Sequence, residues 1–192
     1  MDATNRHDRV VFLDRDGVIN RAPPKGSWVL RWEEFRFADG ALEALRRLAE
    51  QGFTVVVVTN QSCVGRGLVP LSDVEAMNAG MAEAVAAAGG KLAGVYLCPH
   101  TSGEGCSCRK PKPGLIDRAA RELGLRPERA FLVGDADRDI ETGRARGCTT
   151  VFVTSGEGGD GAGLLADHRV SSLAEAVGLI LRLTGGEGPA TS

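Results

Sequence analysis

Five short runs of mainly apolar residues recur along this chain, and longer segments with helical periodicity separate them. The runs are Val10–Leu13, Phe53–Val58, Gly94–Leu97, Ala130–Val133 and Thr149–Val153. Their length and continuous apolar character are typical of strands buried on both faces of a sheet. Strands that alternate with helices form a parallel sheet covered by helices on both sides. The sequence therefore predicts a three-layer α/β fold.

The segments between these strands carry helix signals. The helix predicted over Asp39–Gln51 has apolar residues three and four apart, with Asp39 as its expected N-cap and Gly52 as its end. Asp137 is the expected N-cap of a later helix. The other predicted helices are Leu71–Ala88, Gly114–Leu123, Asp137–Arg146 and Ser172–Leu183.

Composition limits the classes of protein that the chain can belong to. It has 192 residues, of which 43% are hydrophobic, and a net charge of −2, so nothing favours nucleic acid or an anionic membrane as a partner. No apolar run approaches the roughly 20 residues that span a bilayer. We expect a cytoplasmic monomer with one domain at 10–183 and flexible termini at 1–9 and 184–192.

Carboxylates follow two of the predicted strands where those strands end. Asp14 and Asp16 come directly after the first strand, and Asp135 follows the fourth. Because parallel strands end at one edge of a sheet, these side chains are expected to converge there. Three oxygen donors of this kind suit Mg²⁺ shared with a substrate phosphate. Asp139, one helical turn after Asp135, is either a further ligand or an acid that stabilises the helix N-terminus.

Two further polar segments lie near that edge. Thr59 offers a hydroxyl, and the backbone N–H groups after it can bind phosphate oxygens. Lys110, next to Arg109, can offset repulsion between an aspartate nucleophile and a phosphate dianion. Each segment also has a simpler interpretation, a turn after the second strand and a solvated basic loop.

A third group of residues predicts a zinc site. Three thiols and one imidazole fall within eleven positions, at Cys98, His100, Cys106 and Cys108. Four such ligands match a closed tetrahedral Zn²⁺ site that holds a loop in place. The zinc is expected to be structural, because no coordination position stays open. Cys63 and Cys148 are interpreted as ordinary thiols.

These motifs together resemble the haloacid dehalogenase-like hydrolases, and within them the heptose 1,7-bisphosphate phosphatases, which share a subgroup with histidinol-phosphate phosphatases. The resemblance covers about 10–153 and is carried by FLDRDGVIN, VVVVTNQS, CPH, CxCRKPKPG and VGD. It implies a Rossmann-like fold without a large cap domain, in which the zinc-binding loop and the segment 21–37 form the walls of the pocket.

The resemblance also implies a mechanism. Asp14 would attack phosphorus and form an aspartyl-phosphate, and Asp16 would serve first as general acid and then as general base. Mg²⁺ would be held by the side chains of Asp14 and Asp135 and by the backbone carbonyl of Asp16. Thr59 and Lys110 would stabilise the transferring phosphoryl group.

Substrate binding is implied for a second set of residues, and here the chain departs from the family. The expected contacts to a phosphorylated sugar come from Arg15, Asn60, Gln61, Ser62 and Arg109. Ala136 stands where relatives often have a lysine, for which Lys25 or Arg31 is a candidate replacement. The segment 21–37 lacks the family's Gly-Tyr pair and carries Trp28 and Trp32, which line the pocket or close one edge of the core.

The function expected from the resemblance is removal of the C7 phosphate of D-glycero-D-manno-heptose 1,7-bisphosphate. Two alternatives keep the same chemistry, with histidinol phosphate or another sugar phosphate of secondary metabolism as substrate. A third, from a different class, is a non-catalytic binding module stabilised by zinc. The presence of Asp16 argues against that module, because a scaffold has no need of a general acid. A phosphotransferase is a further alternative, but no cap segment is evident to exclude water.

Overall fold

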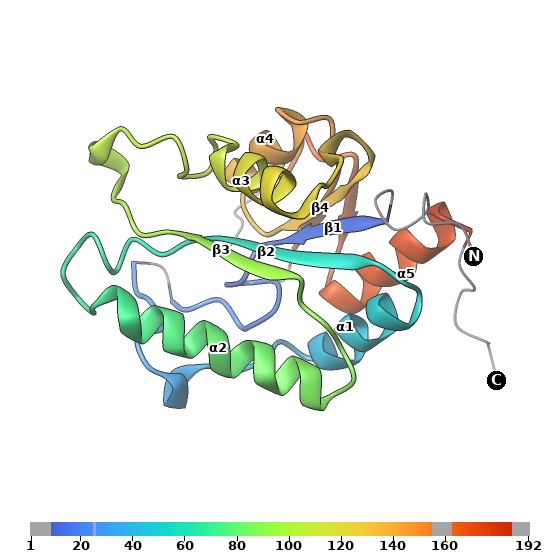
Figure 1. The fold of residues 1–192 in the computed structure, drawn as a ribbon. Helices are drawn as coiled ribbons and strands as arrows, with labels where there is room; N and C mark the ends of the chain where they lie inside the picture. The colour runs from blue at the N-terminus through green and yellow to red at the C-terminus, as the bar shows by residue number, and fades with distance from the viewer. Residues whose placement is uncertain (1–8, 25, 155–162, 186–192) are drawn as a thin grey trace.

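The protein forms one six-stranded parallel sheet in a computed structural model that describes residues 9–24, 26–154 and 163–185 (Figure 1). The strand order is β3-β2-β1-β4-β5-β6. The strands are β1 (Val10–Leu13), β2 (Thr54–Asn60), β3 (Gly94–Cys98), β4 (Phe131–Gly134), β5 (Thr149–Val153) and β6 (His168–Val170). The helices are α1 (Ala41–Glu50), α2 (Leu71–Ala87), α3 (Gly114–Leu123), α4 (Asp137–Arg144) and α5 (Leu173–Leu183). The predicted α/β architecture is confirmed.

Helices cover both faces of the sheet, so the fold has three layers (Figure 1). Helices α1, α2 and α5 pack on one face, and α3 and α4 pack on the other. The alternation of side chains along β1 divides its residues between the two cores. Val11 and Leu13 point into the core with α1, α2 and α5, whereas Val10 and Phe12 join the core with α3. This explains why β1 is apolar at every position.

Several local predictions were wrong. Asp39 does not cap α1, since Gly40 holds the N-cap position with φ of 72°, and Asp39 instead pairs with Arg21 on the surface. Ala136, not Asp137, is the N-cap of α4. Strand β6 was missed because three residues with one apolar side chain carry no recognisable alternation. Three 3₁₀ helices in the described part of the chain were also missed; they are Trp32–Glu34, Ser102–Glu104 and Pro127–Arg129.

The prediction of flexible termini at 1–9 and 184–192 falls almost entirely outside the described residues. Among the helices that the structure describes, none is long and apolar enough to cross a membrane.

Candidate active site

The site begins where β1 ends. The backbone N–H of Asp14 donates to the Val133 carbonyl of β4 at 2.9 Å, which continues the sheet by one hydrogen bond. The Asp14 side chain is buried, with 4% of the residue exposed. Gly17, with φ of 83°, completes the turn, and a Cβ there would lie 1.9 Å from Asp135 Oδ2. The glycine of DxDG is therefore required by both its backbone angle and its contact with Asp135.

Three carboxylates converge at this end of the sheet. One oxygen of each of Asp14, Asp135 and Asp139 lies within 4.8 Å of the others. Burial, together with the charges of the neighbouring acids, raises the pKa of Asp14 to about 6 and that of Asp135 to about 8. Asp135 Oδ1 is buried without a hydrogen-bond partner among the described residues. Buried, mutually repelling oxygens with free lone pairs fit a small divalent cation such as Mg²⁺.

Lys110 balances part of this negative charge. Its Nζ lies 2.8 Å from Asp14 Oδ1 and 2.7 Å from Asp139 Oδ1, and it donates to the Val58 carbonyl at 2.8 Å. Burial opposes its charge, but Asp139 and Asp14 raise the pKa of Lys110, so it stays protonated. Asn60 fixes the backbone of Lys110 through two hydrogen bonds of 3.1 Å. Asn60 Oδ1 accepts from the Lys110 N–H, and Asn60 Nδ2 donates to the Lys110 carbonyl. The ammonium therefore faces the Asp14 carboxylate in a fixed position.

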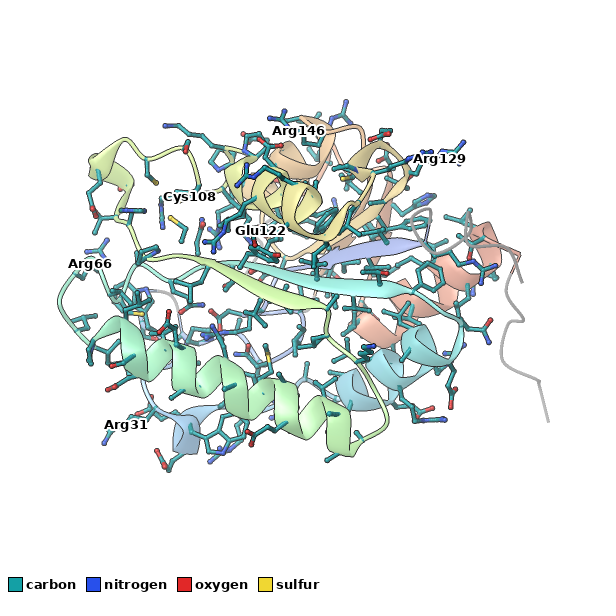
Figure 2. The ribbon with its side chains drawn as sticks, viewed as in Figure 1. Arg31, Arg66, Cys108, Glu122, Arg129 and Arg146 are labelled. Carbon is teal, nitrogen blue, oxygen red and sulfur yellow. The ribbon has the colours of Figure 1, made fainter. Side chains whose placement is uncertain are left out.

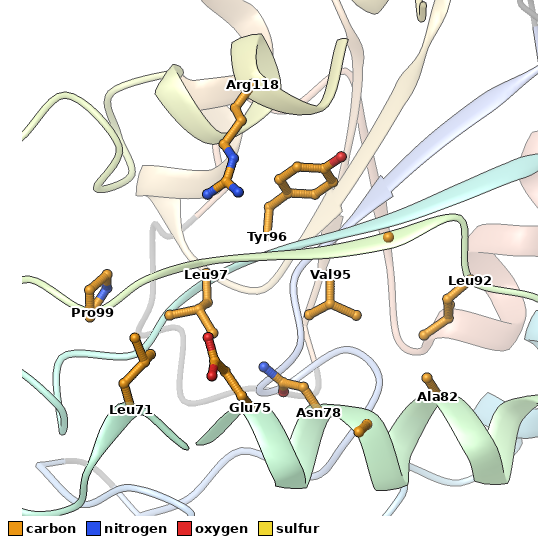
Figure 3. A pocket seen from close by; sticks show the side chains of 12 residues that line it. Leu71, Glu75, Asn78, Ala82, Leu92, Val95, Tyr96, Leu97, Pro99 and Arg118 are labelled. Atoms are coloured by element: carbon orange, nitrogen blue, oxygen red, sulfur yellow. The ribbon is translucent and has the colours of Figure 1, made fainter. Parts of the chain in front are cut away.

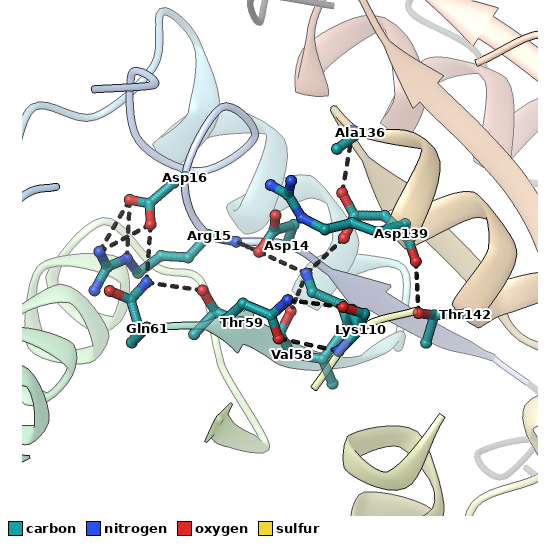
Figure 4. A network of polar contacts seen from close by, with 12 residues as sticks. Asp14, Arg15, Asp16, Val58, Thr59, Gln61, Lys110, Ala136, Asp139 and Thr142 are labelled. Atoms are coloured by element: carbon teal, nitrogen blue, oxygen red, sulfur yellow. Dashed lines mark hydrogen bonds and ion pairs between the residues drawn. The ribbon is translucent and has the colours of Figure 1, made fainter. Parts of the chain in front are cut away.

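Asp16 points to a different set of partners (Figure 4). Its carboxylate accepts hydrogen bonds from Asn20 Nδ2 at 2.9 Å, from Gln61 Nε2 at 2.8 Å and from Arg15 at 2.9–3.2 Å. Gln61 Nε2 also donates to Thr59 Oγ1 at 2.9 Å, which links the ends of β1 and β2. About a quarter of the Asp16 side chain stays exposed, 24%, so it can reach a bound substrate.

The four predicted zinc ligands also come together. Cys98 Sγ lies 3.2 Å from Cys108 Sγ and 3.7 Å from Cys106 Sγ, and His100 Nδ1 lies 3.5 and 3.3 Å from the sulfurs of Cys98 and Cys108. Ligands about 2.3 Å from a tetrahedral Zn²⁺ are about 3.7 Å from one another. All five cysteines are free thiols. The donor set and its spacing fit Zn²⁺.

Comparisons with known proteins agree with this geometry. The HAD-hydrolase-like family model matches residues 107–177. The D-glycero-β-D-manno-heptose-1,7-bisphosphate 7-phosphatase of Pseudomonas putida is 39% identical over 150 residues, 78% of this chain and 85% of that protein. The corresponding α-anomer phosphatase of Mycobacterium tuberculosis is 37% identical over 175 residues, 88% of this chain and 90% of that protein.

Solved structures give the same result. The heptose 1,7-bisphosphate phosphatase from B. bronchiseptica, crystallised with magnesium and phosphate, has a TM-score of 0.84 at 32% identity, covering 91% of this chain and 99% of that one. The chain belongs to the heptose 1,7-bisphosphate phosphatase family. It is therefore a haloacid dehalogenase-like hydrolase, and the resemblance found in the sequence is confirmed.

Within this phosphatase fold, several residues predicted to bind substrate make other contacts. Arg15 is fully buried, and its guanidinium donates to Asp16 and Asn78, which favours a positioning role over direct contact with substrate. The side chains of Asn60 and Gln61 likewise hold Lys110 and Asp16. Ser62 is buried at 7% exposure. Arg109 is half-buried beside the segment 98–108 that carries the three clustered thiols, called the thiol loop below. Its Nη1 donates to the His100 carbonyl at 3.0 Å.

The segment 21–37 packs against the core at one point and contacts the segment after β2 at another. Phe35 stacks on Trp32 with ring centroids 5.1 Å apart and is buried in the core, so this part closes an edge of the core. Trp28 instead lies under the Arg66 guanidinium at 5.1 Å, joining this segment to the one after β2. Arg31 pairs with Glu34 on the surface, and Lys25 lies outside the described residues.

Sequence reasoning missed two contributors to this phosphatase site, Asn20 and Arg138, and left the role of a third, Asp139, open. Asn20 is fully buried against Asp16, four residues after it. Asp139 is a partner of Lys110 as well as an acceptor for the Ala136 N–H at 3.1 Å, so both interpretations of it were incomplete. Arg138 was not considered. Its side chain is exposed at the surface of α4, and although partial desolvation opposes its charge, four nearby acids, Asp139 first, raise its pKa.

A pocket of about 540 Å³ lies beside the site, between α2 and the edge strand β3 (Figure 3). Leu71, Glu75 and Asn78 of α2 face Val95 and Leu97 of β3 across it. None of the predicted site residues lines this pocket. The cluster of Asp14, Asp135 and Asp139 lies at the carboxyl ends of β1 and β4, and the thiol loop with Cys108 lies at the same end (Figure 2).

Proposed function

We propose that this protein is a Mg²⁺-dependent phosphomonoesterase that removes the C7 phosphate of D-glycero-D-manno-heptose 1,7-bisphosphate. The observation that carries the proposal is the buried Asp14 carboxylate, 2.8 Å from Lys110 and grouped with Asp135 and Asp139. A carboxylate beside a fixed cation is a suitable nucleophile for phosphorus, because the cation offsets repulsion between the two anions. The named substrates of the relatives supply the sugar.

The reaction proceeds in two displacements. Asp14 Oδ attacks phosphorus, the bond from phosphorus to the sugar oxygen breaks, and Asp16 gives its proton to that oxygen. Asp16 then takes a proton from water as the water attacks phosphorus, which releases phosphate and restores Asp14. Thr59 and Lys110 bind the transferring phosphoryl oxygens. Asp14, Asp135 and the Asp16 carbonyl would hold Mg²⁺, which would supply positive charge to neutralise the phosphoryl oxygens.

We assign a second group of cations to the substrate. A bisphosphate keeps one phosphate away from the reacting centre, and that phosphate needs its own positive partner. Arg109 lies at the thiol loop, and Arg138 lies on the first turn of α4. Arg138 is proposed to take the place of the lysine that relatives often carry at position 136, since its charge acts on four acids of the site, Asp139, Asp14, Asp135 and Asp16.

The thiol cluster is proposed to hold a structural Zn²⁺ through Cys98, His100, Cys106 and Cys108. Four protein ligands leave no position for a substrate or water. Its role is to fix the loop that leads to Arg109 and Lys110, and so to place both cations.

The experiment that tests the proposal is phosphate release in the presence of Mg²⁺ across a panel of substrates, with the Asp14→Asn protein as blank. The panel contains both anomers of heptose 1,7-bisphosphate, histidinol phosphate and several hexose phosphates. The proposal expects the highest kcat/KM for one heptose anomer. A preference for histidinol phosphate or a uniform rate keeps the chemistry and overturns the substrate, and no turnover at all favours a binding module.

A further inference from the structure

Arg15 is an unusual residue to find between two catalytic carboxylates, because its side chain has no exposed surface. The guanidinium forms a fork on Asp16, with Nη2 at 2.9 and 3.1 Å from the two carboxylate oxygens and Nε at 3.2 Å from Oδ1. A planar fork of this kind fixes the orientation of a carboxylate as well as its position. Whatever fixes Arg15 therefore fixes Asp16.

Helix α2 provides that anchor. Arg15 Nη1, the nitrogen that does not touch Asp16, donates to Asn78 Oδ1 at 3.1 Å, and Met77 Sδ lies 3.7 Å away. Phe35 covers the guanidinium with its ring centroid 5.8 Å from Cζ. Because a guanidinium has only donors, Asn78 must present its oxygen to Arg15. The strong acceptor for Nη1 is thus one side chain on an element that carries none of the recognised motifs.

In the described part of the structure, the Asn78 side chain makes one hydrogen bond, the one to Arg15. It is 5% exposed, and its Nδ2 has no hydrogen-bond partner there. A buried amide with an unpaired nitrogen is unfavourable by about 1–3 kcal/mol, so its presence calls for a compensating contact. The hydrogen bond to Arg15 is that contact.

We propose that Asn78 is a positioning residue for phosphoryl transfer, which through Arg15 holds the Asp16 carboxylate toward the leaving oxygen of the substrate. The inference rests on the proposed function, which gives Asp16 its acid and base roles. Without the Asn78 oxygen, Nη1 is a buried donor of a charged group with no strong acceptor, and the guanidinium rotates to find one. Asn20 and Gln61 still bind Asp16, so the group is misaligned and not released.

Two substrates with different leaving groups test this role. A sugar phosphate expels an alkoxide and depends on a general acid, whereas 4-nitrophenyl phosphate expels a stable phenolate and does not. The variant Asn78→Leu removes the acceptor at similar volume. We expect its kcat on the heptose bisphosphate to fall about 10- to 100-fold with KM unchanged, and its kcat on 4-nitrophenyl phosphate to fall less than about threefold.

Three further proteins complete the comparison. Asn78→Asp keeps the acceptor oxygen and is expected to retain the wild-type ratio of the two activities. Arg15→Lys keeps the charge but cannot span Asp16 and Asn78, so it is expected to lose the sugar phosphate selectively and tests the same link should Asn78→Leu not fold. Met81→Leu, a buried position on the same helix without a contact to Arg15, is expected to leave both activities unchanged.

The possible failures are distinguishable. Equal loss on both substrates in Asn78→Leu and Arg15→Lys, or no loss on either, means that Asn78 has a structural role only and overturns the inference while leaving the proposed function intact. A wild-type protein that hydrolyses 4-nitrophenyl phosphate but no sugar phosphate overturns the proposed function itself, and the role assigned to Asn78 with it.

Discussion

Two clusters of side chains that could hold a metal ion lie at the same end of the sheet, and the protein builds them in different ways. The carboxylate cluster takes one member each from the ends of β1 and β4 and from α4, and Asp14 and Asp139 are buried. The thiol cluster takes Cys98 from the last position of β3 and its other three members from the loop that directly follows. Three of those four are only partly buried, and their sulfur and nitrogen atoms mainly contact one another.

Because the two clusters are built differently, we expect the carboxylate cluster to serve activity and the thiol cluster to serve stability. The sheet and its helices fix the carboxylates, and the same fold buries them despite their mutual repulsion. A site that opposes folding is expected where charge is needed for chemistry. The thiol loop has the opposite balance, because few contacts other than the ligands themselves would hold it. We therefore expect substitutions in the first cluster to remove activity and substitutions in the second to remove stability.

The largest effect is expected from Asp14→Asn. Turnover should fall by about 10⁴-fold or more, since the amide cannot form the phosphoryl intermediate. In buffer without added Mg²⁺, the Tm should be no lower than that of the wild type, because one of three repelling acids is gone. Phosphate release and a thermal melt measure both. A variant that loses turnover and unfolds would break the proposed division between the two clusters.

Lys110 belongs to the carboxylate cluster, yet we expect its substitution to lower both activity and stability. Lys110→Met leaves Asp14 and Asp139 buried without their shared cation, so we expect activity to fall about 10²- to 10³-fold and stability by about 3 kcal/mol. Adding Asp139→Asn should restore part of the stability and none of the activity. Urea unfolding and phosphate release on the single and double variants test this, and equal stability of the two would mean that the pair with Asp139 contributes nothing.

The sequence predicted five of the six described strands, the five described helices, the meeting of Asp14 with Asp135 and the grouping of the three thiols with His100, because each depends on short-range patterns. Apolar runs identify strands, and the order of strands and helices requires that polar residues at strand ends meet. Local helix ends were less predictable. Asp39 and Asp137 are favourable N-cap types, yet Gly40 and Ala136 occupy those positions, because the chain path into α1 and α4 decides which residue stands there.

The supporting residues of the site were beyond the reach of sequence patterns. Asn78 contacts Arg15 across 63 positions of the chain, and Asn60 contacts Lys110 across 50. Such pairs are set by tertiary packing, with no spacing that could reveal them. For the same reason Arg15, Asn60 and Gln61 were predicted to touch substrate, although they hold other site residues. Asn20 and Asp139 carried a weak signal, because each lies four residues after a motif aspartate.

A smaller effect, on stability alone, is expected at Cys106. Purified protein should contain about one Zn²⁺ per chain, and Cys106→Ser should lose it together with about 3 kcal/mol of stability, roughly 6–12 °C in Tm. Metal analysis and a thermal melt measure the two. Cys148→Ala, a buried thiol outside the cluster, is the control and should keep its zinc. A Cys106→Ser protein that stays folded but is inactive would give the thiol cluster a catalytic role.

The smallest effect is expected where the two regions are tied together. Asp117 on α3, the helix after the thiol loop, accepts hydrogen bonds of 2.5 and 2.7 Å from Arg146, which follows α4. The hydrogen bond from Arg146 lowers the pKa of Asp117 below its ordinary 3.8. Its stabilisation is therefore complete above pH 3.8 and is lost as pH falls through the lowered pKa. Both side chains are more than a third exposed, so Asp117→Asn should cost less than about 1 kcal/mol of stability at pH 7.

That difference in stability between Asp117→Asn and wild type should vanish in unfolding measurements at low pH, with activity at pH 7 unchanged. A difference that persists below the lowered pKa, or a loss of activity, would mean that the tie acts through packing between the two regions and not through charge.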